Sequence, residues 1–151
     1  MKGAVKRAVL LVCAVILVIT SFYAYNIIFD KGRVSECEVI IGESKIFTEK
    51  EIERAAAAVK TKFRSFEGCT LSKLEYDEEY RNESVKHYMQ TGGGSVNGVK
   101  EENVIIFKSS FLAENPKGDS GLTEGLEYRG WNWIVIRNSK NSRWIVKDWG
   151  Y

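Results

Sequence analysis

The hydrophobic pattern begins with an uncharged run near the N-terminus. Residues 8–29 contain no charged residue, and they follow Lys2, Lys6 and Arg7. A helix rises about 1.5 Å per residue and the hydrocarbon core of a bilayer is about 30 Å thick, so about 20 apolar residues cross it. The run therefore predicts a transmembrane helix in contact with membrane lipid. The basic residues before it predict a cytoplasmic N-terminus and place the rest of the chain outside the cytoplasm.

A cleaved signal peptide is the alternative interpretation of the same run. Cleavage requires small residues at positions −3 and −1, and the best site follows Ala24, where position −3 is Phe22. The aromatic segment at residues 23–26 is instead typical of a membrane interface. The pattern favours an uncleaved signal anchor over residues 1–30 and leaves secretion after cleavage as the alternative.

The clearest helical pattern lies in residues 49–67. Thr48 can cap this helix, and Glu51 three residues later completes a capping box. Gly68 suits the left-handed position that follows a helix end. Apolar residues recur at spacings of three and four, as they do on one face of a helix: Ile52, Ala55, Ala56, Val59, Phe63 and Phe66.

The hydrophobic pattern in the rest of the chain predicts strands and one short helix. We expect a strand with a bulge at residues 69–76, a short helix near 79–89, and a loop in the glycine-rich segment 90–98. Three further strands are predicted at residues 104–107, 128–137 and 143–151. A hairpin at residues 138–142 joins the last two. This order predicts an α+β domain in which a long helix packs on a curved antiparallel sheet.

The predicted domain covers residues 37–151, after a short polar linker at residues 31–36. Its strand at residues 128–137 is apolar on both faces, with Trp131, Trp133 and Val135 on one face and Ile134 and Ile136 on the other. Such a strand is covered on both sides. One face is expected to pack on the long helix. The alternatives for covering the other face are the anchor-proximal segment, a curled edge of the sheet and a ligand.

The charge balance argues against nucleic acid as a partner. The chain holds 22 Lys plus Arg and 20 Asp plus Glu, of which three basic residues and one acid lie in residues 1–30. Residues 31–151 therefore carry equal numbers of basic and acidic residues. Nucleic-acid-binding domains need a basic excess to neutralise phosphates.

The motifs that would indicate a nucleotide, a metal or another cofactor are incomplete. Gly93 and Gly98 have the spacing of a phosphate-binding loop, but Val99 stands where the motif requires lysine. His87 is the only histidine of the chain, and no Cys-x-x-Cys accompanies it, so a zinc ligand set is missing. We therefore expect no nucleotide, no metal and no cofactor, and we assign no catalytic residue.

Large aromatic side chains gather in the C-terminal part of the sequence. Such residues build cores, and they also dominate binding interfaces. Tyr128, Trp131 and Trp133 are therefore our candidate ligand or interface residues, with Asp148 as a polar contact. His87 is a candidate for the edge of a pocket, and it would form an acid–base pair with Asp148 if the domain were an enzyme.

Cys37 and Cys69 are candidates for a disulfide. An oxidising compartment outside the cytoplasm allows such a bond. Closing a loop of this size would stabilise the domain by roughly 3–4 kcal/mol. Two separate buried thiols are the alternative.

The C-terminal strands resemble a known family. The ending Asp148-Trp149-Gly150-Tyr151, together with segments 131–137 and 101–105, is similar to a family of uncharacterised bacterial domains, mostly from Firmicutes. The resemblance covers residues 37–151. It implies the NTF2-like and cystatin-like class, in which a curved sheet wraps a long helix as a cone. It implies no catalytic residues.

These observations favour a membrane-anchored extracytoplasmic domain that serves as a non-enzymatic binding or assembly module, with an extracytoplasmic protein as its partner. One alternative is a small-molecule-binding or enzymatic NTF2-like domain that uses a concave pocket. Another is a subunit of a secretion or conjugation assembly, which would share the layout of one anchor helix and one domain. A fold alone does not decide among these functions.

Overall fold

The computed structural model describes residues 6, 12–21, 31–118 and 120–151. The chain divides into two compact units, Met1–Lys31 and Gly32–Tyr151.

The N-terminal unit contains a helical stretch at residues 12–21. The side chains of this stretch are exposed, and Thr20 Oγ1 donates to the carbonyl oxygens of Ile16 and Leu17 at 2.9 and 3.0 Å. The rest of the predicted span at residues 8–29 lies outside the described residues. Among the residues that are described, no helix has both the length and the apolar character that a membrane crossing requires.

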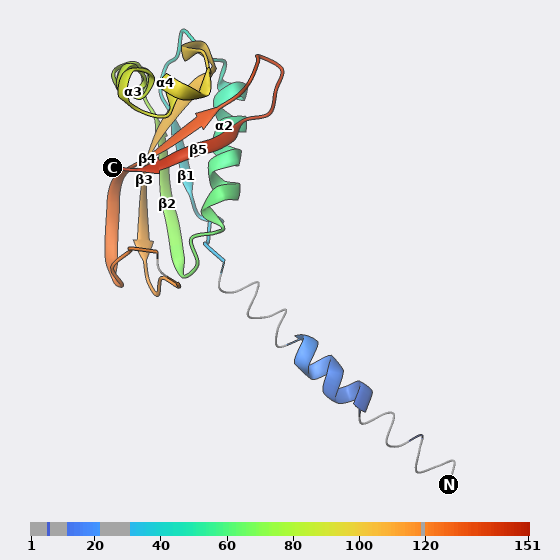
Figure 1. Cartoon of the computed structure of the whole chain (residues 1–151). Helices are drawn as coiled ribbons and strands as arrows, with labels where there is room; N and C mark the ends of the chain where they lie inside the picture. The colour runs from blue at the N-terminus through green and yellow to red at the C-terminus, as the bar shows by residue number, and fades with distance from the viewer. Residues whose placement is uncertain (1–5, 7–11, 22–30, 119) are drawn as a thin grey trace. The chain divides into compact units, whose positions relative to one another are not determined.

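The second unit is an α+β domain, as the sequence predicts (Figure 1). Its elements follow one another as β1 (Glu38–Ile41), α2 (Glu49–Phe63), β2 (Cys69–Tyr76), α3 (Glu78–Thr91), α4 (Gly94–Asn97), a 3-10 turn (Glu101–Asn103), β3 (Val104–Ala113), β4 (Leu126–Ile136) and β5 (Ile145–Gly150).

The strands form one sheet in the order β1-β2-β3-β4-β5. β1 runs parallel to β2, whereas the other neighbours are antiparallel. The prediction of a wholly antiparallel sheet is therefore wrong at the β1 edge. The cause is the connection: α2 lies between β1 and β2 and returns the chain to the end of the sheet where β1 began, as parallel pairing requires. The bulge predicted in β2 is confirmed by a register shift between Leu71 and Lys73.

The N-terminus of α2 has the predicted capping box. Thr48 Oγ1 accepts a hydrogen bond from the Glu51 N–H at 3.3 Å, and the Thr48 N–H donates to Glu51 Oε2 at 3.0 Å. Two backbone donors that the first turn leaves unpaired are thereby satisfied. The start of this helix is encoded locally.

The C-terminus of α2 lies at Phe63, earlier than predicted. The chain turns there, with the Phe66 N–H donating to the Phe63 carbonyl at 2.8 Å, and the Phe66 ring stacks on the Phe63 ring with centroids 5.2 Å apart. Gly68, at φ +70°, follows this turn, and a Cβ there would lie 1.8 Å from the Asn115 carbonyl oxygen. Close packing of Gly68 against the loop at Asn115 therefore fixes the position of this turn. The helical periodicity of the sequence does not show this contact.

The segment after β2 is more helical than predicted. Asp77 caps α3 by accepting a hydrogen bond from the Tyr80 N–H at 2.7 Å, so the helix begins at Glu78. α4 then occupies Gly94–Asn97, inside the segment predicted to be a loop. A Cβ on Gly94 would lie 2.8 Å from the Tyr88 ring, so the glycine lets α4 pack directly on α3.

β3 continues well beyond its predicted apolar run because its polar residues have partners. Ser109 is 1% exposed, and its hydroxyl donates to the Trp131 carbonyl at 3.2 Å. The same oxygen accepts from the Trp133 indole N–H at 2.8 Å. A buried serine with both bonds made does not interrupt a strand.

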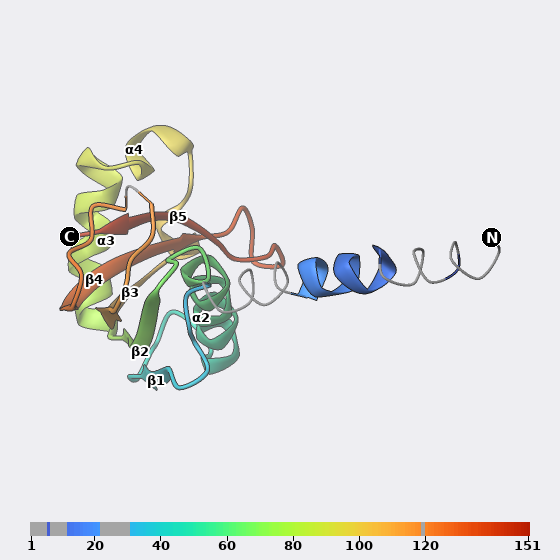
Figure 2. The ribbon, with the colours of Figure 1, turned by 90° about the horizontal axis from the view of Figure 1, so that it is seen from below.

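The sheet is covered on both faces, by α2 on one and by α3 on the other (Figure 2). Trp133 and Val135 of β4 belong to the larger core beneath α2, whereas Ile134 and Ile136 pack beneath α3 with Val85. The predicted alternation along β4 is confirmed. The sequence left open which element covers the second face of β4. In the structure, α3 covers it.

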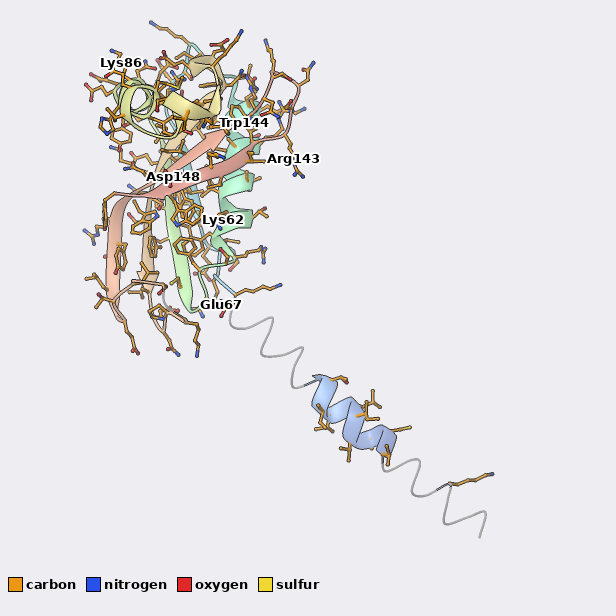
Figure 3. The ribbon with its side chains drawn as sticks, in the orientation of Figure 1. Lys62, Glu67, Lys86, Arg143, Trp144 and Asp148 are labelled. Atoms are coloured by element: carbon orange, nitrogen blue, oxygen red, sulfur yellow. The ribbon has the colours of Figure 1, made fainter. Side chains whose placement is uncertain are left out.

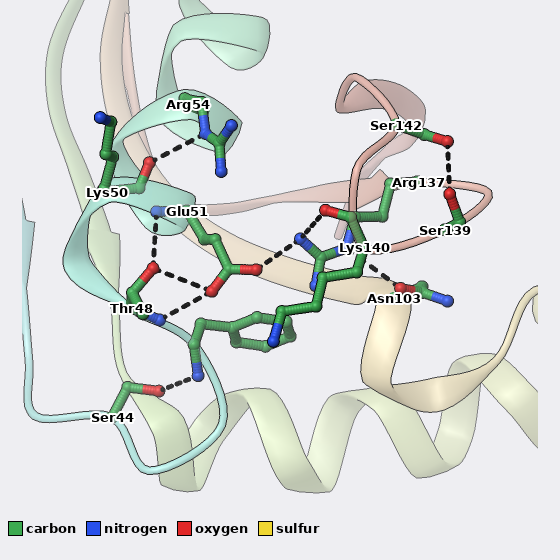
Figure 4. Close-up of polar contacts among 11 residues, drawn as sticks. Ser44, Thr48, Lys50, Glu51, Arg54, Asn103, Arg137, Ser139, Lys140 and Ser142 are labelled. Atoms are coloured by element: carbon green, nitrogen blue, oxygen red, sulfur yellow. Dashed lines mark hydrogen bonds and ion pairs between the residues drawn. The ribbon is translucent and has the colours of Figure 1, made fainter.

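A buried ion pair joins the first turn of α2 to the residue after β4 (Figure 4). Arg137 Nη1 lies 2.6 Å from Glu51 Oε1, with the two residues 5% and 6% exposed, and Arg137 Nε donates to Asn103 Oδ1 at 3.0 Å. Burial by itself would raise the pKa of Glu51. Hydrogen bonds from the Thr48 backbone, Arg137 and the Thr48 hydroxyl outweigh it and lower that pKa to about 2.

Cys37 and Cys69 are both free, buried thiols in the core beneath α2. The predicted disulfide is therefore absent from the structure, which has the two separate thiols of the alternative. The register explains this result, because Glu38, next to Cys37, pairs with Lys73, well beyond Cys69 along β2. Burial raises the pKa of both thiols, that of Cys69 to about 11, which disfavours the reactive thiolate.

Candidate functional site

Two of the candidate aromatic residues lie in the core. Trp133 is fully buried, and its indole N–H is bound by Ser109. Tyr128 is 8% exposed, stacks on Phe111 with centroids 5.0 Å apart, and accepts a hydrogen bond from the Thr123 N–H at 2.7 Å. The contacts of both side chains are made within the domain, as expected of core residues.

Trp131 lies at the edge of the same core. It is partly buried, and its ring meets those of Tyr128 and Tyr151 edge to face, with centroids 5.7 and 5.2 Å apart. In the part of the chain that the structure describes, its indole N–H is buried without a hydrogen-bond partner. Trp131 therefore contributes to packing and leaves one donor unused.

A groove of about 560 Å³ lies between α3 and the C-terminal strands. It brings together His87 and Asp148, which are 61 positions apart in the chain. Figure 3 shows Asp148 on β5 beneath α3, whose position Lys86 marks. The lining residues come from α3 and the residue that follows it (Tyr80, Glu83, Ser84, His87, Tyr88 and Gly92), from β3 and β4 (Ile106, Asn132 and Ile134), and from the end of the chain (Asp148, Trp149, Gly150 and Tyr151).

The register of β4 and β5 explains why Asp148 faces this groove. Asp148 pairs with Ile134, which packs beneath α3, and Trp149 pairs with Trp133, which packs beneath α2. Neighbouring residues of a strand point to opposite faces of the sheet. The carboxylate of Asp148 is therefore on the α3 side, and Trp149 borders the groove from the far side of β5.

Helical spacing explains the other wall. Tyr80, Glu83, Ser84 and His87 recur along α3 at intervals of three and four, so they share one face of the helix. Val85 and Tyr88 occupy the neighbouring face and are buried against the sheet. Of this set, only His87 was a candidate from the sequence. The periodicity of Tyr80, Glu83 and Ser84 was the available signal for the others.

Hydrogen bonds fix the aromatic walls of the groove. Tyr80 Oη donates to Asn132 Oδ1 at 2.5 Å, which ties α3 to β4. Asn97 Nδ2 of α4 donates to Tyr88 Oη at 2.7 Å. The pKa of Tyr88 is raised, mainly by burial and partly by the negative charge of Asp148, so its hydroxyl stays neutral.

The polar groups on the rim remain accessible. Glu83, His87 and Asp148 are exposed. Among the described residues, neither carboxylate forms an ion pair, although Asp148 Oδ1 accepts from the Trp149 N–H at 2.9 Å. The described residues also contain no group of three or more His, Cys, Asp or Glu that could hold a metal ion. The groove thus offers hydrogen-bond acceptors, aromatic rings and an apolar floor, as ligand sites commonly do.

Comparison with known proteins gives a family whose function is unknown. No curated protein and no solved structure matches the chain. Residues 24–150 match the model of one family, a domain of unknown function (DUF4829). This match covers most of the chain and supports the resemblance to an uncharacterised family that its C-terminal residues suggest. The chain therefore belongs to the DUF4829 family.

Proposed function

We propose that this chain is a membrane-anchored binding module whose domain lies outside the cytoplasm and binds a ligand in the groove between α3 and β5. One observation carries the binding role: the groove presents exposed polar side chains from α3 and β5, whereas the opposite face of the sheet is filled by the aromatic core. A site needs side chains whose bonding capacity is not already used by the fold.

The anchor rests on the N-terminal sequence and on the exposure of its helical stretch. The uncharged run at residues 8–29 is long enough to cross a bilayer. In the stretch at residues 12–21, Leu17 and Val18 are 66% and 69% exposed. Transfer of apolar surface out of water is favourable by about 25 cal/mol of free energy per Å². The lipid interior of a membrane provides the apolar environment for this transfer.

The likeness to NTF2-like and cystatin-like domains of Firmicutes is part of this proposal. It is supported by the long helix α2, which packs on one face of a sheet with several register shifts. The groove differs from the concave pocket expected of such a cone, because the side beneath α2 is filled and the groove lies beneath α3. An extracytoplasmic protein partner and a role in a larger secretion assembly remain further proposals.

The location is tested by labelling intact cells with a membrane-impermeant lysine reagent. Lys86 and Lys147 are exposed in the domain, and Lys2 and Lys6 precede the proposed anchor. We expect Lys86 and Lys147 to react in intact cells and Lys2 and Lys6 to react only after lysis. Labelling of neither pair before lysis, in cells whose other surface proteins react, would contradict the proposed location.

Binding in the groove is tested by native mass spectrometry of the full chain after extraction in a mild detergent. Ser84 lines the groove, so Ser84→Trp fills it, whereas Lys86→Trp adds the same ring to α3 outside the lining. We expect a small bound mass on the wild type and on Lys86→Trp, and its loss from Ser84→Trp. The same retained mass on all three proteins would place the ligand elsewhere.

A hydrolytic enzyme is the second candidate function. Ser84, His87 and Asp148, the residue types of a nucleophile, a base and its orienting acid, line the same groove. Within the described residues no hydrogen bond joins these three side chains, and His87 instead contacts Thr91 Oγ1 at 3.3 Å. This arrangement makes binding the better-supported function. If the wild type hydrolysed 4-nitrophenyl acetate and Ser84→Ala abolished this activity, hydrolysis would become the better-supported function.

A further inference from the structure

The charges of the groove all have the same sign. Glu83 and Asp148 line it from α3 and β5, and in the described part of the chain no lysine or arginine does so. The domain as a whole carries equal numbers of acids and bases, so the negative charge of the groove does not follow from the overall composition. A charged site with no internal counterion is complementary to a ligand of opposite charge.

The aromatic rings around the groove favour the same kind of ligand. Tyr80 and Tyr88 line it from α3, and the faces of such rings attract cations. One of the chain's own ammonium groups already lies on one of these rings. Lys108 Nζ is 3.8 Å from the Tyr80 centroid. Lys108 does not line the groove, and in the described part of the chain no other lysine or arginine does.

The floor of the groove is apolar. Ile106 and Ile134 line it, and both belong to the core beneath α3 or pack against it. A ligand that covers this floor needs an apolar part beside its charge. The volume of about 560 Å³ falls within the range of about 300–1,000 Å³ that is typical of small-molecule sites.

Resting on the proposed binding function, we infer that the ligand is a small organic ammonium ion with an apolar substituent. Its positive charge lies between the carboxylates of Glu83 and Asp148 and the ring of Tyr88, and its apolar part covers Ile106 and Ile134. No covalent step is involved. The inference names the chemical class of the ligand and assigns Glu83 and Asp148 as the residues that select its charge.

The test uses three probes of similar size and different charge: benzyltrimethylammonium, benzyl alcohol and benzenesulfonate. Each is titrated into the ¹⁵N-labelled full chain in detergent, and the imidazole resonances are followed. His87 is the one histidine of the sequence, and it lines the groove. We expect the ammonium probe to shift the His87 resonances saturably and to bind about tenfold more tightly than benzyl alcohol, with benzenesulfonate the weakest.

Matched variants locate the charge selection. Glu83→Gln and Asp148→Asn are each expected to weaken the ammonium probe about fivefold and to leave benzyl alcohol unchanged. Glu79→Gln removes the same charge from α3 at an exposed residue outside the lining, and it is expected to change binding by less than about twofold. Lys108→Gln removes a cation beside Tyr80 and is expected to tighten the ammonium probe slightly.

The outcomes separate the ligand class from the binding role. If benzyl alcohol or benzenesulfonate binds at His87 as tightly as the ammonium probe, and the amide variants change nothing, the ligand is not a cation while the groove remains a binding site. If no probe shifts the His87 resonances and Ser84→Trp retains the same bound mass as the wild type, both the ligand class and the proposed function are wrong.

Discussion

The two faces of the sheet use similar residues for different purposes. Beneath α2, Trp133, Tyr128 and Phe111 bury their rings, and the polar atoms of Trp133 and Tyr128 are bonded within the domain. Beneath α3, a smaller core leaves a groove whose polar rim is exposed and forms no ion pair among the described residues. Aromatic content alone therefore does not mark a binding site. The distinguishing property is whether polar side chains beside the rings still have bonding capacity to offer.

The largest expected effect is on the α2 face. Trp133→Ala should lower the free energy of unfolding by about 3–5 kcal/mol, because it leaves a cavity in a fully packed core. Urea unfolding of the full chain in detergent measures it, with Trp133→Phe as the milder control. A loss below about 1 kcal/mol would show that this face is not the main core.

The ion pair on the same side gives the domain an acid sensitivity. The pKa of Glu51 is about 2 in the folded protein, against an ordinary 4.5. The stabilisation, about 3 kcal/mol, is present in full above pH 4.5 and is lost as the pH falls toward 2, with about 2 kcal/mol gone at pH 3.

This prediction is checked by urea unfolding of the wild type and Glu51→Gln at pH 6 and pH 3. Glu51→Gln should be less stable at pH 6, because it leaves the Arg137 charge unpaired. Between the two pH values it should lose about 2 kcal/mol less than the wild type does. Equal losses in both proteins would assign the acid sensitivity to other carboxylates.

The α3 face is expected to respond to its helix cap. Asp77→Ala removes the acceptor for the Tyr80 N–H and should cost about 1 kcal/mol. Since α3 forms one wall of the groove, its amides should also exchange faster with deuterium, while those of α2 stay protected. Unchanged exchange in α3 would mean that packing beneath the helix, and not the cap, holds that wall in place.

The smallest stability effects are predicted for the rim of the groove. His87→Ala and Asp148→Asn should change the free energy of unfolding by less than about 0.5 kcal/mol, since both residues are exposed and form no ion pair among the described residues. Thermal unfolding checks this expectation. A loss of 2 kcal/mol or more at either position would make the rim part of the fold.

The sequence predicts what is encoded locally. Thr48 and Glu51 identify the start of α2, and the alternation along β4 assigns Trp133 and Ile134 to opposite faces. The sequence does not reveal the parallel pairing of β1, because pairing partners are chosen by the path of the whole chain. It also misses α4, whose position depends on contacts with Tyr88.

The site was predicted in part for the same reason. His87 and Asp148 were selected as isolated polar residues, and the structure brings both to one groove. Tyr128, Trp131 and Trp133 were selected as a group because they are aromatic, but they belong to the α2 side of the sheet. Which side a strand residue faces depends on register and bulges, and the shift between Ser109 and Ser110 alters the phase within β4.

The central claim is that the α3 groove, and not the α2 face, holds the ligand. Its most direct test compares Ser84→Cys, in the groove, with Thr61→Cys, exposed on α2, each in a Cys13→Ala background. A membrane-impermeant maleimide is applied to intact cells and to the purified full chain after bound small molecules have been removed by exhaustive dialysis, and the labelling rates are compared. A ligand in the groove shields the cysteine at 84 in cells, and its removal exposes that cysteine. We predict that the cysteine at 61 reacts equally fast in both and that the cysteine at 84 reacts much more slowly in cells. Equal rates for the cysteine at 84, or slowing only of the cysteine at 61, would contradict the account.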